Sequence, residues 1–266
     1  MIVDGRQVAH IIYEEVATSV AALHRTPILA AITCAPNFET EKYLQLKKRK
    51  ASDVGITLRV VELSETATTE EVIACIEALL PEVDGVVVQL PFPAHIDREV
   101  VLAAVPVDKD PDGFSYGTVE GACIPPVVGA IKEVAEEHEI TFKGSKVVVL
   151  GAGRLVGAPA AHFLRMAGAD VTVLTEIDSD PIPYLLEADI IITGIGKPHF
   201  VTTDMVKAGV AVFDAGTSED GGVVVGDVHP DVAALARLYT PVPGGIGPIT
   251  VALLLRNLLS LIRQYK

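Results

Sequence analysis

A lysine lies in the middle of an otherwise apolar helical stripe in the first fifth of the chain. A helix expected over residues 38–54 places Tyr43 and Lys47 one turn apart, on the face that also carries Leu44 and Ala51. A lysine on a buried face must find a polar partner or lose its charge, and either outcome suits proton transfer near neutral pH. In the alternative interpretation, Lys47 extends to solvent with its basic neighbours and the Tyr43 ring only fills the core.

A glutamine interrupts an apolar strand further along the chain. The expected strand, residues 85–90, is apolar except for Gln89 near its carboxyl end. Ligands of open parallel sheets bind at that edge, and a buried amide needs polar partners. Two interpretations are open: the partner of Gln89 is the substrate or Lys47, or Gln89 is a structural residue that is satisfied within the protein.

Two acids, Asp110 and Asp112, lie in an Asp-Pro-Asp-Gly turn. Aspartates in such turns usually bond the local backbone, but one of the two could instead face a cleft and bind a cationic or amide-bearing ring. A second special segment, residues 239–250, has the sequence Tyr-Thr-Pro-Val-Pro-Gly-Gly-Ile-Gly-Pro-Ile-Thr. Its glycines let the backbone approach a ligand closely, and a simple connection between a strand and a helix would not need so many special residues.

A nucleotide site is indicated by the stretch from residue 146 to residue 165. An apolar run that ends at Leu150 suits a buried strand, a G-x-G-x-x-x-G pattern follows, and the apolar residues then take helical spacing. The amide groups and the dipole at the start of such a helix favour a pyrophosphate. The next expected strand ends at Glu176, an acid suited to ribose hydroxyls. Two alternative interpretations of the pattern are open: a glycine turn that binds no cofactor, and a Glu176 that is solvated at the end of its strand.

Composition limits the class of protein. The 266 residues include 21 Lys and Arg against 35 Asp and Glu, and the net charge of −14 repels nucleic acid and acidic membranes. Cys34, Cys75 and Cys123 match no zinc spacing, so we expect no metal site and free thiols in a reducing compartment. No signal-peptide pattern is visible at the start, and the longest uncharged run contains three prolines. We therefore expect a cytoplasmic protein that binds neither nucleic acid nor a membrane.

Strand and helix patterns alternate along the chain, which predicts an α/β fold with two α/β domains and mostly parallel sheets, the second a Rossmann-type dinucleotide-binding domain. We expect a substrate and catalytic domain over residues 1–120, joined by a returning C-terminal helix within residues 248–266, and a nucleotide domain over residues 121–247. The expected helices cover residues 5–23, 38–54, 69–80, 97–105, 127–137 and 248–264. The expected strands cover residues 27–33, 57–63, 85–90, 147–150, 170–176, 189–193, 210–214 and 237–240.

The order of the motifs is more specific than any one of them. The chain carries, in sequence, Tyr43-x-x-x-Lys47, Val88-Gln-Leu-Pro-Phe-Pro-Ala-His-Ile-Asp97, Lys109-Asp-Pro-Asp-Gly-Phe114, Gly151-Ala-Gly-Arg-Leu-Val-Gly-Ala-Pro159, Gly226-Asp-Val228 and Thr240-Pro-Val-Pro-Gly-Gly-Ile-Gly-Pro-Ile-Thr250. This order closely resembles the bifunctional methylenetetrahydrofolate dehydrogenase/methenyltetrahydrofolate cyclohydrolase family, often called FolD. The resemblance covers nearly the whole chain.

That resemblance implies a two-domain enzyme, usually a homodimer, with folate in a cleft against a Rossmann domain. Such an enzyme oxidises 5,10-methylenetetrahydrofolate with NAD(P)+ and hydrolyses the methenyl product to 10-formyltetrahydrofolate. The resemblance implies that Lys47 is the catalytic lysine, Gln89 its partner, Tyr43 the ring that stacks on the pterin and Asp112 the pterin anchor. It also implies substrate contacts from Leu90, Pro91, Pro243, Gly244 and Gly245. It implies cofactor contacts from Gly151, Ala152, Gly153, Arg154, Val156, Gly157, Thr175, Glu176, Thr193, Gly194, Thr217 and Thr250.

The chain departs from the usual family pattern at four places. Thr40 stands for a serine, Ala122-Cys-Ile-Pro125 for Pro-Cys-Thr-Pro, and Gly151-Ala-Gly153 for Gly-Arg-Ser, while the loop over residues 115–121 is short. The short loop keeps open a dehydrogenase that lacks cyclohydrolase activity. Two further hypotheses are a catalytically silent nucleotide-binding module and a two-domain dehydrogenase acting on a small acid, such as a shikimate dehydrogenase.

We expect the cofactor to be NAD+ rather than NADP+. An NADP enzyme needs a cation near the 2′-phosphate, yet Ala152 stands where many relatives carry an arginine. An acid such as Glu176 beside that phosphate would cost about 4 kcal/mol at roughly 4 Å with an effective dielectric constant near 20. Arg154 is the one nearby cation in the sequence, and the start of the helix can direct it to the pyrophosphate instead.

Overall fold

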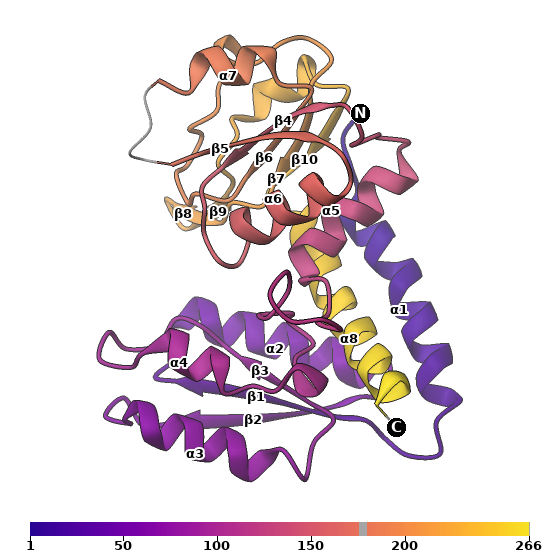
Figure 1. Ribbon diagram of the computed structural model, residues 1–266, viewed down its shortest axis with the longest axis vertical. Helices are drawn as coiled ribbons and strands as arrows, with labels where there is room; N and C mark the ends of the chain where they lie inside the picture. The colour runs from indigo at the N-terminus through magenta and orange to yellow at the C-terminus, as the bar shows by residue number, and fades with distance from the viewer. Residues whose placement is uncertain (176–179, 266) are drawn as a thin grey trace. The chain divides into compact units, whose positions relative to one another are not determined.

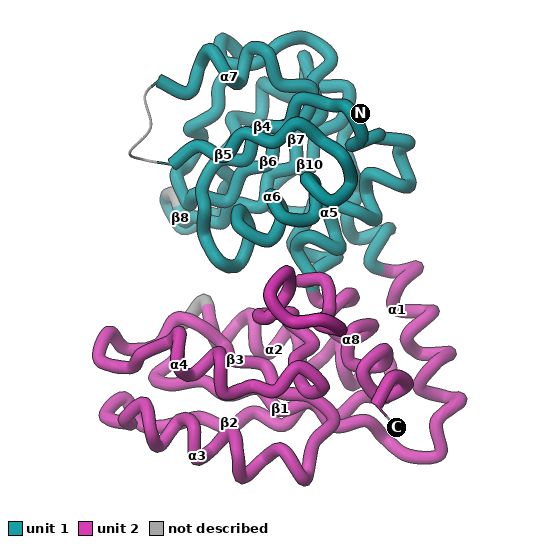
Figure 2. Tube along the Cα trace, viewed as in Figure 1, with its two compact units in different colours: residues 1–9, 126–250 teal, residues 10–125, 251–266 magenta. Residues whose placement is uncertain are grey.

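The structure, a computed structural model, describes residues 1–175 and 180–265. The chain divides into two compact units: unit 1 contains residues 1–9 and 126–250, and unit 2 contains residues 10–125 and 251–266 (Figure 2). Each unit combines helices with a parallel sheet, so the predicted α/β class is confirmed (Figure 1). Residues 121–125 fall in unit 2 and residues 248–250 in unit 1, a few residues from the expected boundaries. The largest difference is at the start of the chain, where the first nine residues belong to unit 1. The reason is a pairing with the last strand of that unit, in which Ile2 forms a parallel bridge to Tyr239.

Unit 2 is built around a three-stranded parallel sheet with the strand order β2-β1-β3. Its elements are α1 (Gly5–Ala21), which begins in unit 1, followed by β1 (Ile28–Cys34), α2 (Phe38–Asp53), β2 (Thr57–Leu63), α3 (Thr69–Leu79), β3 (Gly85–Val88), α4 (Arg98–Ala103) and the 3-10 helix η1 (Val107–Lys109). Helix α2 begins where the sequence predicted, because the Asn37 side chain accepts a hydrogen bond from the Thr40 amide at 2.8 Å.

Unit 1 is built around a five-stranded parallel sheet with the strand order β10-β7-β6-β4-β5. Its elements are α5 (Pro126–Glu137), β4 (Lys146–Leu150), α6 (Gly157–Met166), β5 (Asp170–Leu174), α7 (Ile182–Glu187), β6 (Ile190–Thr193), η2 (Thr203–Met205), β7 (Ala211–Asp214), β8 (Ser218–Asp220), β9 (Val223–Val225), η3 (Pro230–Ala234), β10 (Leu238–Thr240) and α8 (Ile246–Gln264), which ends in unit 2. The β8–β9 hairpin and the six-residue α7 were not predicted, because both are too short to show a clear periodicity.

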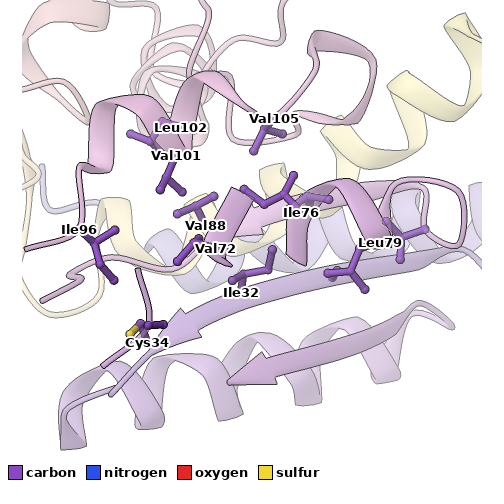
Figure 3. Close-up of a cluster of buried hydrophobic side chains, with 14 residues drawn as sticks. Ile32, Cys34, Val72, Ile76, Leu79, Val88, Ile96, Val101, Leu102 and Val105 are labelled. Atoms are coloured by element: carbon purple, nitrogen blue, oxygen red, sulfur yellow. The ribbon is translucent and has the colours of Figure 1, made fainter. Parts of the chain in front are cut away.

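Side chains of the unit 2 sheet alternate between two differently covered faces. On the first face, Ile32 of β1 and Val88 of β3 join an apolar cluster with Val72 and Ile76 of α3 and with side chains of α4 (Figure 3). The opposite face is covered by α2 and α8. Gly85 shows this for α8, because a Cβ atom at that position would lie 2.7 Å from a methyl carbon of Leu258.

Thr33 lies on this second face, and we predict that its hydroxyl group destabilises the fold. The side chain is fully buried, and its hydroxyl has no hydrogen-bond partner among the described residues. An unsatisfied buried hydroxyl costs about 1–3 kcal/mol, so Thr33→Val should raise the free energy of unfolding in urea by about 1 kcal/mol. The matched control is Thr57→Val, at an exposed position of the neighbouring strand, which should change little. A lower stability of Thr33→Val would show instead that the hydroxyl has a partner, such as water.

Candidate active site

Lys47 and Gln89 meet on the second face of the unit 2 sheet. Lys47 is 8% exposed, and its ammonium nitrogen donates a hydrogen bond to the Gln89 side-chain oxygen at 2.9 Å. Gln89 directly follows β3, and its backbone amide continues the strand pairing by donating to the Ile32 carbonyl at 2.8 Å. Strand alternation therefore turns its side chain toward α2, away from the apolar cluster. Lys48 and Arg49, in contrast, are exposed, so Lys47 does not follow its basic neighbours into solvent.

The Tyr43 ring lies beside the lysine. The ammonium nitrogen of Lys47 is 4.9 Å from the ring centroid of Tyr43, within the range of a cation–π interaction. The ring is half-buried, so part of its surface remains accessible. One turn of α2 therefore presents a cation and an aromatic ring together, as the helical spacing predicted.

The two acids of the Asp-Pro-Asp-Gly turn have different surroundings. Asp110 is almost completely buried and accepts hydrogen bonds from the amides of Gly113 at 2.9 Å and Ser115 at 3.4 Å. Asp112 is half-buried; desolvation raises the pKa of its carboxyl group, and the charge of Lys47 opposes that rise. Asp110 therefore shapes the turn, whereas Asp112 shares the electrostatic environment of the lysine. Unit 2 thus brings Tyr43, Lys47, Gln89 and Asp112 into one neighbourhood.

The residues after Gln89 form an irregular segment. Leu90 is half-buried against the apolar cluster, Pro91 is exposed, and the peptide bond between them is cis. The side-chain amide of Gln89 donates to the Leu90 carbonyl at 3.2 Å. The glutamine thus connects the lysine to the backbone of this segment.

The three glycines at the connection from β4 to α6 occur for different physical reasons. Gly151 has a φ of +90°, a region that favours glycine. A Cβ atom on Gly157 would lie 1.9 Å from the Gly151 carbonyl oxygen, so no side chain fits there. A Cβ atom on Gly153 would meet nothing within 4 Å. The exposed stretch that also contains Ala152 and Arg154 therefore lies at the start of α6 with room for a ligand, which fits a pyrophosphate site.

Two buried carboxylates accept hydrogen bonds from backbone amides close to the ends of β6 and β7. Asp227 accepts hydrogen bonds from the Thr193 hydroxyl at 2.7 Å and the Ile195 amide at 2.8 Å. Asp214 accepts from the Val228 amide at 2.9 Å, and burial raises the pKa of Asp214 to about 6. The hydroxyl hydrogen of Thr193 is therefore used inside the protein. Neither acid was identified from the sequence as a functional residue, although an aspartate that ends an apolar strand was a visible signal.

The other predicted cofactor residues lie at several positions of unit 1. Val156 packs against Gly194, where a Cβ atom would lie 2.7 Å from a Val156 methyl group. Thr175 and Thr217 are exposed after β5 and β7, respectively. Thr250 is buried on α8 and donates its hydroxyl to the Gly247 carbonyl at 2.8 Å. Glu176 lies outside the described residues.

The proline- and glycine-rich loop before α8 is held by the N-terminal segment of unit 1. The Gly5 amide donates to the Gly244 carbonyl at 2.9 Å, and a Cβ atom on Gly5 would lie 1.8 Å from the Gly245 carbonyl oxygen. Pro243 is exposed and follows a cis peptide bond. The predicted substrate residues of this loop therefore belong to unit 1, whereas Lys47 and its neighbours belong to unit 2.

Two further features concern metals and membranes. Residues 1–175 and 180–265 contain no group of three or more His, Cys, Asp or Glu side chains that could hold a metal ion. Within the same residues, α8 is the one helix long and apolar enough to cross a membrane, and 67% of its apolar stretch is buried inside the protein. That degree of burial is typical of a core helix.

Comparison with known proteins gives consistent matches along the chain. Residues 3–112 match the catalytic domain, and residues 123–266 the NAD(P)-binding domain, of the family described as tetrahydrofolate dehydrogenase/cyclohydrolase. The bifunctional protein FolD of Mycoplasmopsis synoviae (strain 53) is 36% identical over 253 residues, which cover 90% of each chain.

Solved structures agree with these matches. The bifunctional FolD of Campylobacter jejuni has a TM-score of 0.96 at 32% identity, covering 100% of this chain and 99% of that one. The Trypanosoma brucei methylenetetrahydrofolate dehydrogenase-cyclohydrolase, in complex with NADP and an inhibitor, has a TM-score of 0.92 at 33% identity and covers 99% and 97%.

Asp110 should make the stability of the protein depend on pH. Burial and the nearby Asp112 raise the pKa of Asp110 to about 7, against about 3.9 in an unfolded chain. The folded state therefore binds this proton more tightly, and the contribution of Asp110 to the free energy of unfolding falls as the pH rises from about 4 to about 7. Asp110→Asn cannot titrate, so it should lose less stability than the wild type between about pH 5 and pH 8 in urea denaturation.

The control for this experiment is Asp53→Asn, at an exposed position near the end of α2, which should keep the wild-type pH dependence. Equal pH dependence in the wild type and Asp110→Asn would show that Asp110 does not titrate in this range.

Proposed function

Because the chain belongs to the tetrahydrofolate dehydrogenase/cyclohydrolase family, we propose that it oxidises 5,10-methylenetetrahydrofolate with a nicotinamide cofactor and then hydrolyses the methenyl product to 10-formyltetrahydrofolate. The family resemblance read from the motifs is thereby confirmed. The single observation that carries the chemistry is the buried Lys47 ammonium, which bonds to Gln89 beside the Tyr43 ring. A catalytically silent nucleotide-binding module has no need of such a buried cation.

In this mechanism, Lys47 moves protons and helps to activate water in the hydrolysis step. Gln89 fixes the direction of the ammonium group and thereby its reach toward the substrate. Hydrolysis adds water to the methenyl carbon and releases one proton, so a proton-transfer group at this place assists directly; such groups typically contribute about 10²–10⁴-fold in rate. The Tyr43 ring would stack on the flat pterin, and the Asp112 carboxylate would accept hydrogen bonds from its amide and amino groups.

The cofactor, when bound, accepts the hydride from the methylene carbon. The segment 151–157 would hold its pyrophosphate, because Gly151 and Gly157 shape a tight turn at the start of α6 and Gly153 leaves space. We infer a preference for NAD+. The support for this preference is the small, exposed Ala152, which offers no cation to a 2′-phosphate, and the acid Glu176 in the sequence after β5.

We also infer a homodimer in the cytoplasm that binds neither nucleic acid nor membranes. The family resemblance supports the dimer, and the net charge of −14 disfavours polyanionic partners. Sedimentation equilibrium at micromolar concentration, with a mass near that of one chain, would overturn the dimer.

Lys47→Met should strongly slow the cyclohydrolase reaction. The variant keeps the apolar stem of the lysine and removes the ammonium, so hydrolysis of the methenyl substrate should fall by about 10²–10⁴-fold. Lys48→Met is the matched control, because Lys48 is the next residue of α2 and is exposed. It should retain wild-type activity in the same spectrophotometric assay. Intact hydrolysis in Lys47→Met would remove Lys47 from the mechanism.

The cofactor preference should appear in kcat/KM measured with each nucleotide. We expect a higher value with NAD+, and Glu176→Gln should shift the preference toward NADP+, because it removes a charge that repels the 2′-phosphate. Ala152→Arg should shift it in the same direction by adding a cation. A wild-type kcat/KM at least about tenfold higher with NADP+ would overturn this preference and make Arg154 the next residue to test.

A further inference from the structure

Helix α8 reaches the Asp-Pro-Asp-Gly turn of unit 2 through one side chain. The side-chain nitrogen of Asn257 donates one hydrogen bond to the Pro111 carbonyl and another to the Ile124 carbonyl, each at 2.9 Å. An asparagine amide has two hydrogens, so both of its donors are used. The two carbonyls lie near the two ends of the loop that joins the turn to α5, and Asn257 therefore ties these ends together.

The two tied segments are packed closely against each other. Gly113 has a φ of +70°, and a Cβ atom on it would lie 2.3 Å from the Cys123 carbonyl oxygen. Backbone hydrogen bonds within the loop connect near neighbours, such as the Tyr116 amide to the Gly113 carbonyl at 3.0 Å. The bonds from Asn257 span 146 and 133 residues of sequence. They therefore link this irregular loop to a long, mostly buried helix.

Asp112 lies between the residues that these contacts hold. Asn257 fixes the Pro111 carbonyl on one side of it, and the Asp110 carboxylate accepts from the Gly113 amide on the other. The backbone of Asp112 is thus held from both directions. A half-buried carboxylate that binds a rigid pterin ring gains affinity from such preorganisation, because less of the protein has to become ordered when the ligand binds.

We propose that Asn257 is a positioning residue for folate recognition: it holds the Pro111 carbonyl so that Asp112 keeps its place in the neighbourhood of Lys47. This inference rests on the proposed function and on the role of Asp112 in it. Asn257 acts through the turn, because both amide hydrogens of its side chain are donated to the two carbonyls.

The test is steady-state kinetics of Asn257→Ala and Asn257→Asp. We expect the KM for methylenetetrahydrofolate to rise about five- to tenfold in Asn257→Ala, with the KM for the nicotinamide cofactor unchanged. Asn257→Asp should be at least as impaired, because a carboxylate would face two carbonyl oxygens. The control is Thr68→Ala, which removes the N-cap of α3 in the same unit, away from the turn, and should lower the melting temperature without changing either KM.

A double-mutant cycle with Asp112→Asn separates positioning from general stability. If Asn257 acts through Asp112, adding Asn257→Ala to Asp112→Asn should raise the folate KM by less than about twofold further. Full additivity, or an Asn257→Ala variant that behaves like Thr68→Ala, would overturn the inference while leaving the proposed function intact. An Asp112→Asn variant with an unchanged folate KM would instead overturn the role of Asp112 in the proposed function, and with it the basis for this inference.

Discussion

The candidate site depends on one constraint: the Lys47 ammonium is buried and must keep a polar partner. A buried charge without a partner destabilises a protein. Removing one partner of a buried pair typically costs about 3–5 kcal/mol of stability, because the remaining charge is uncompensated. The partner is Gln89, and its direction follows from the alternation of β3. A shift of that strand by one residue would turn the glutamine into the apolar cluster of Val72 and Ile76 and leave the lysine alone. The site therefore forms only when the strands of the unit 2 sheet pair in this register.

Unit 1 uses buried carboxylates to organise irregular backbone in a similar way. Asp214 and Asp227 accept amide hydrogens from loops that have no strand or helix to satisfy them. Their space is reserved by glycines: a Cβ atom on Gly216 would lie 2.2 Å from the carboxyl carbon of Asp227, and one on Gly226 would lie 2.1 Å from an oxygen of Asp214. Gly226 of the Gly226-Asp-Val228 motif and Gly216 thus leave room for the two carboxylates that organise these loops.

Features that depend on residues close together in the sequence could be predicted, whereas contacts between residues distant in the sequence could not. The proximity of Lys47 to Tyr43 and the start of α2 follow from local periodicity and a cap, and the order of the motifs identified the family. Periodicity left open whether Lys47 is buried or extends to solvent, and the structure shows that it is buried. The structure was needed where the partners are distant in sequence. The pairing of Ile2 with Tyr239 moved the first nine residues into unit 1, and nothing local to α8 indicated that Asn257 bonds to Pro111 and Ile124. The turn pattern alone did not distinguish Asp110 from Asp112; the family resemblance pointed to Asp112, and the structure shows how the surroundings of the two differ.

The glycine loop after β4 contains two kinds of position that the sequence motif alone does not distinguish. Gly151 adopts a positive φ that favours glycine, and Gly157 has no room for a Cβ atom. Substitution at either position should therefore impair folding. Ala152, Gly153 and Arg154 are exposed, and the Cβ position of Gly153 is open, so substitutions there should leave the fold intact. Under the proposed function, a lineage could therefore vary the cofactor contacts of this loop through these three adjacent codons without passing through an intermediate that fails to fold.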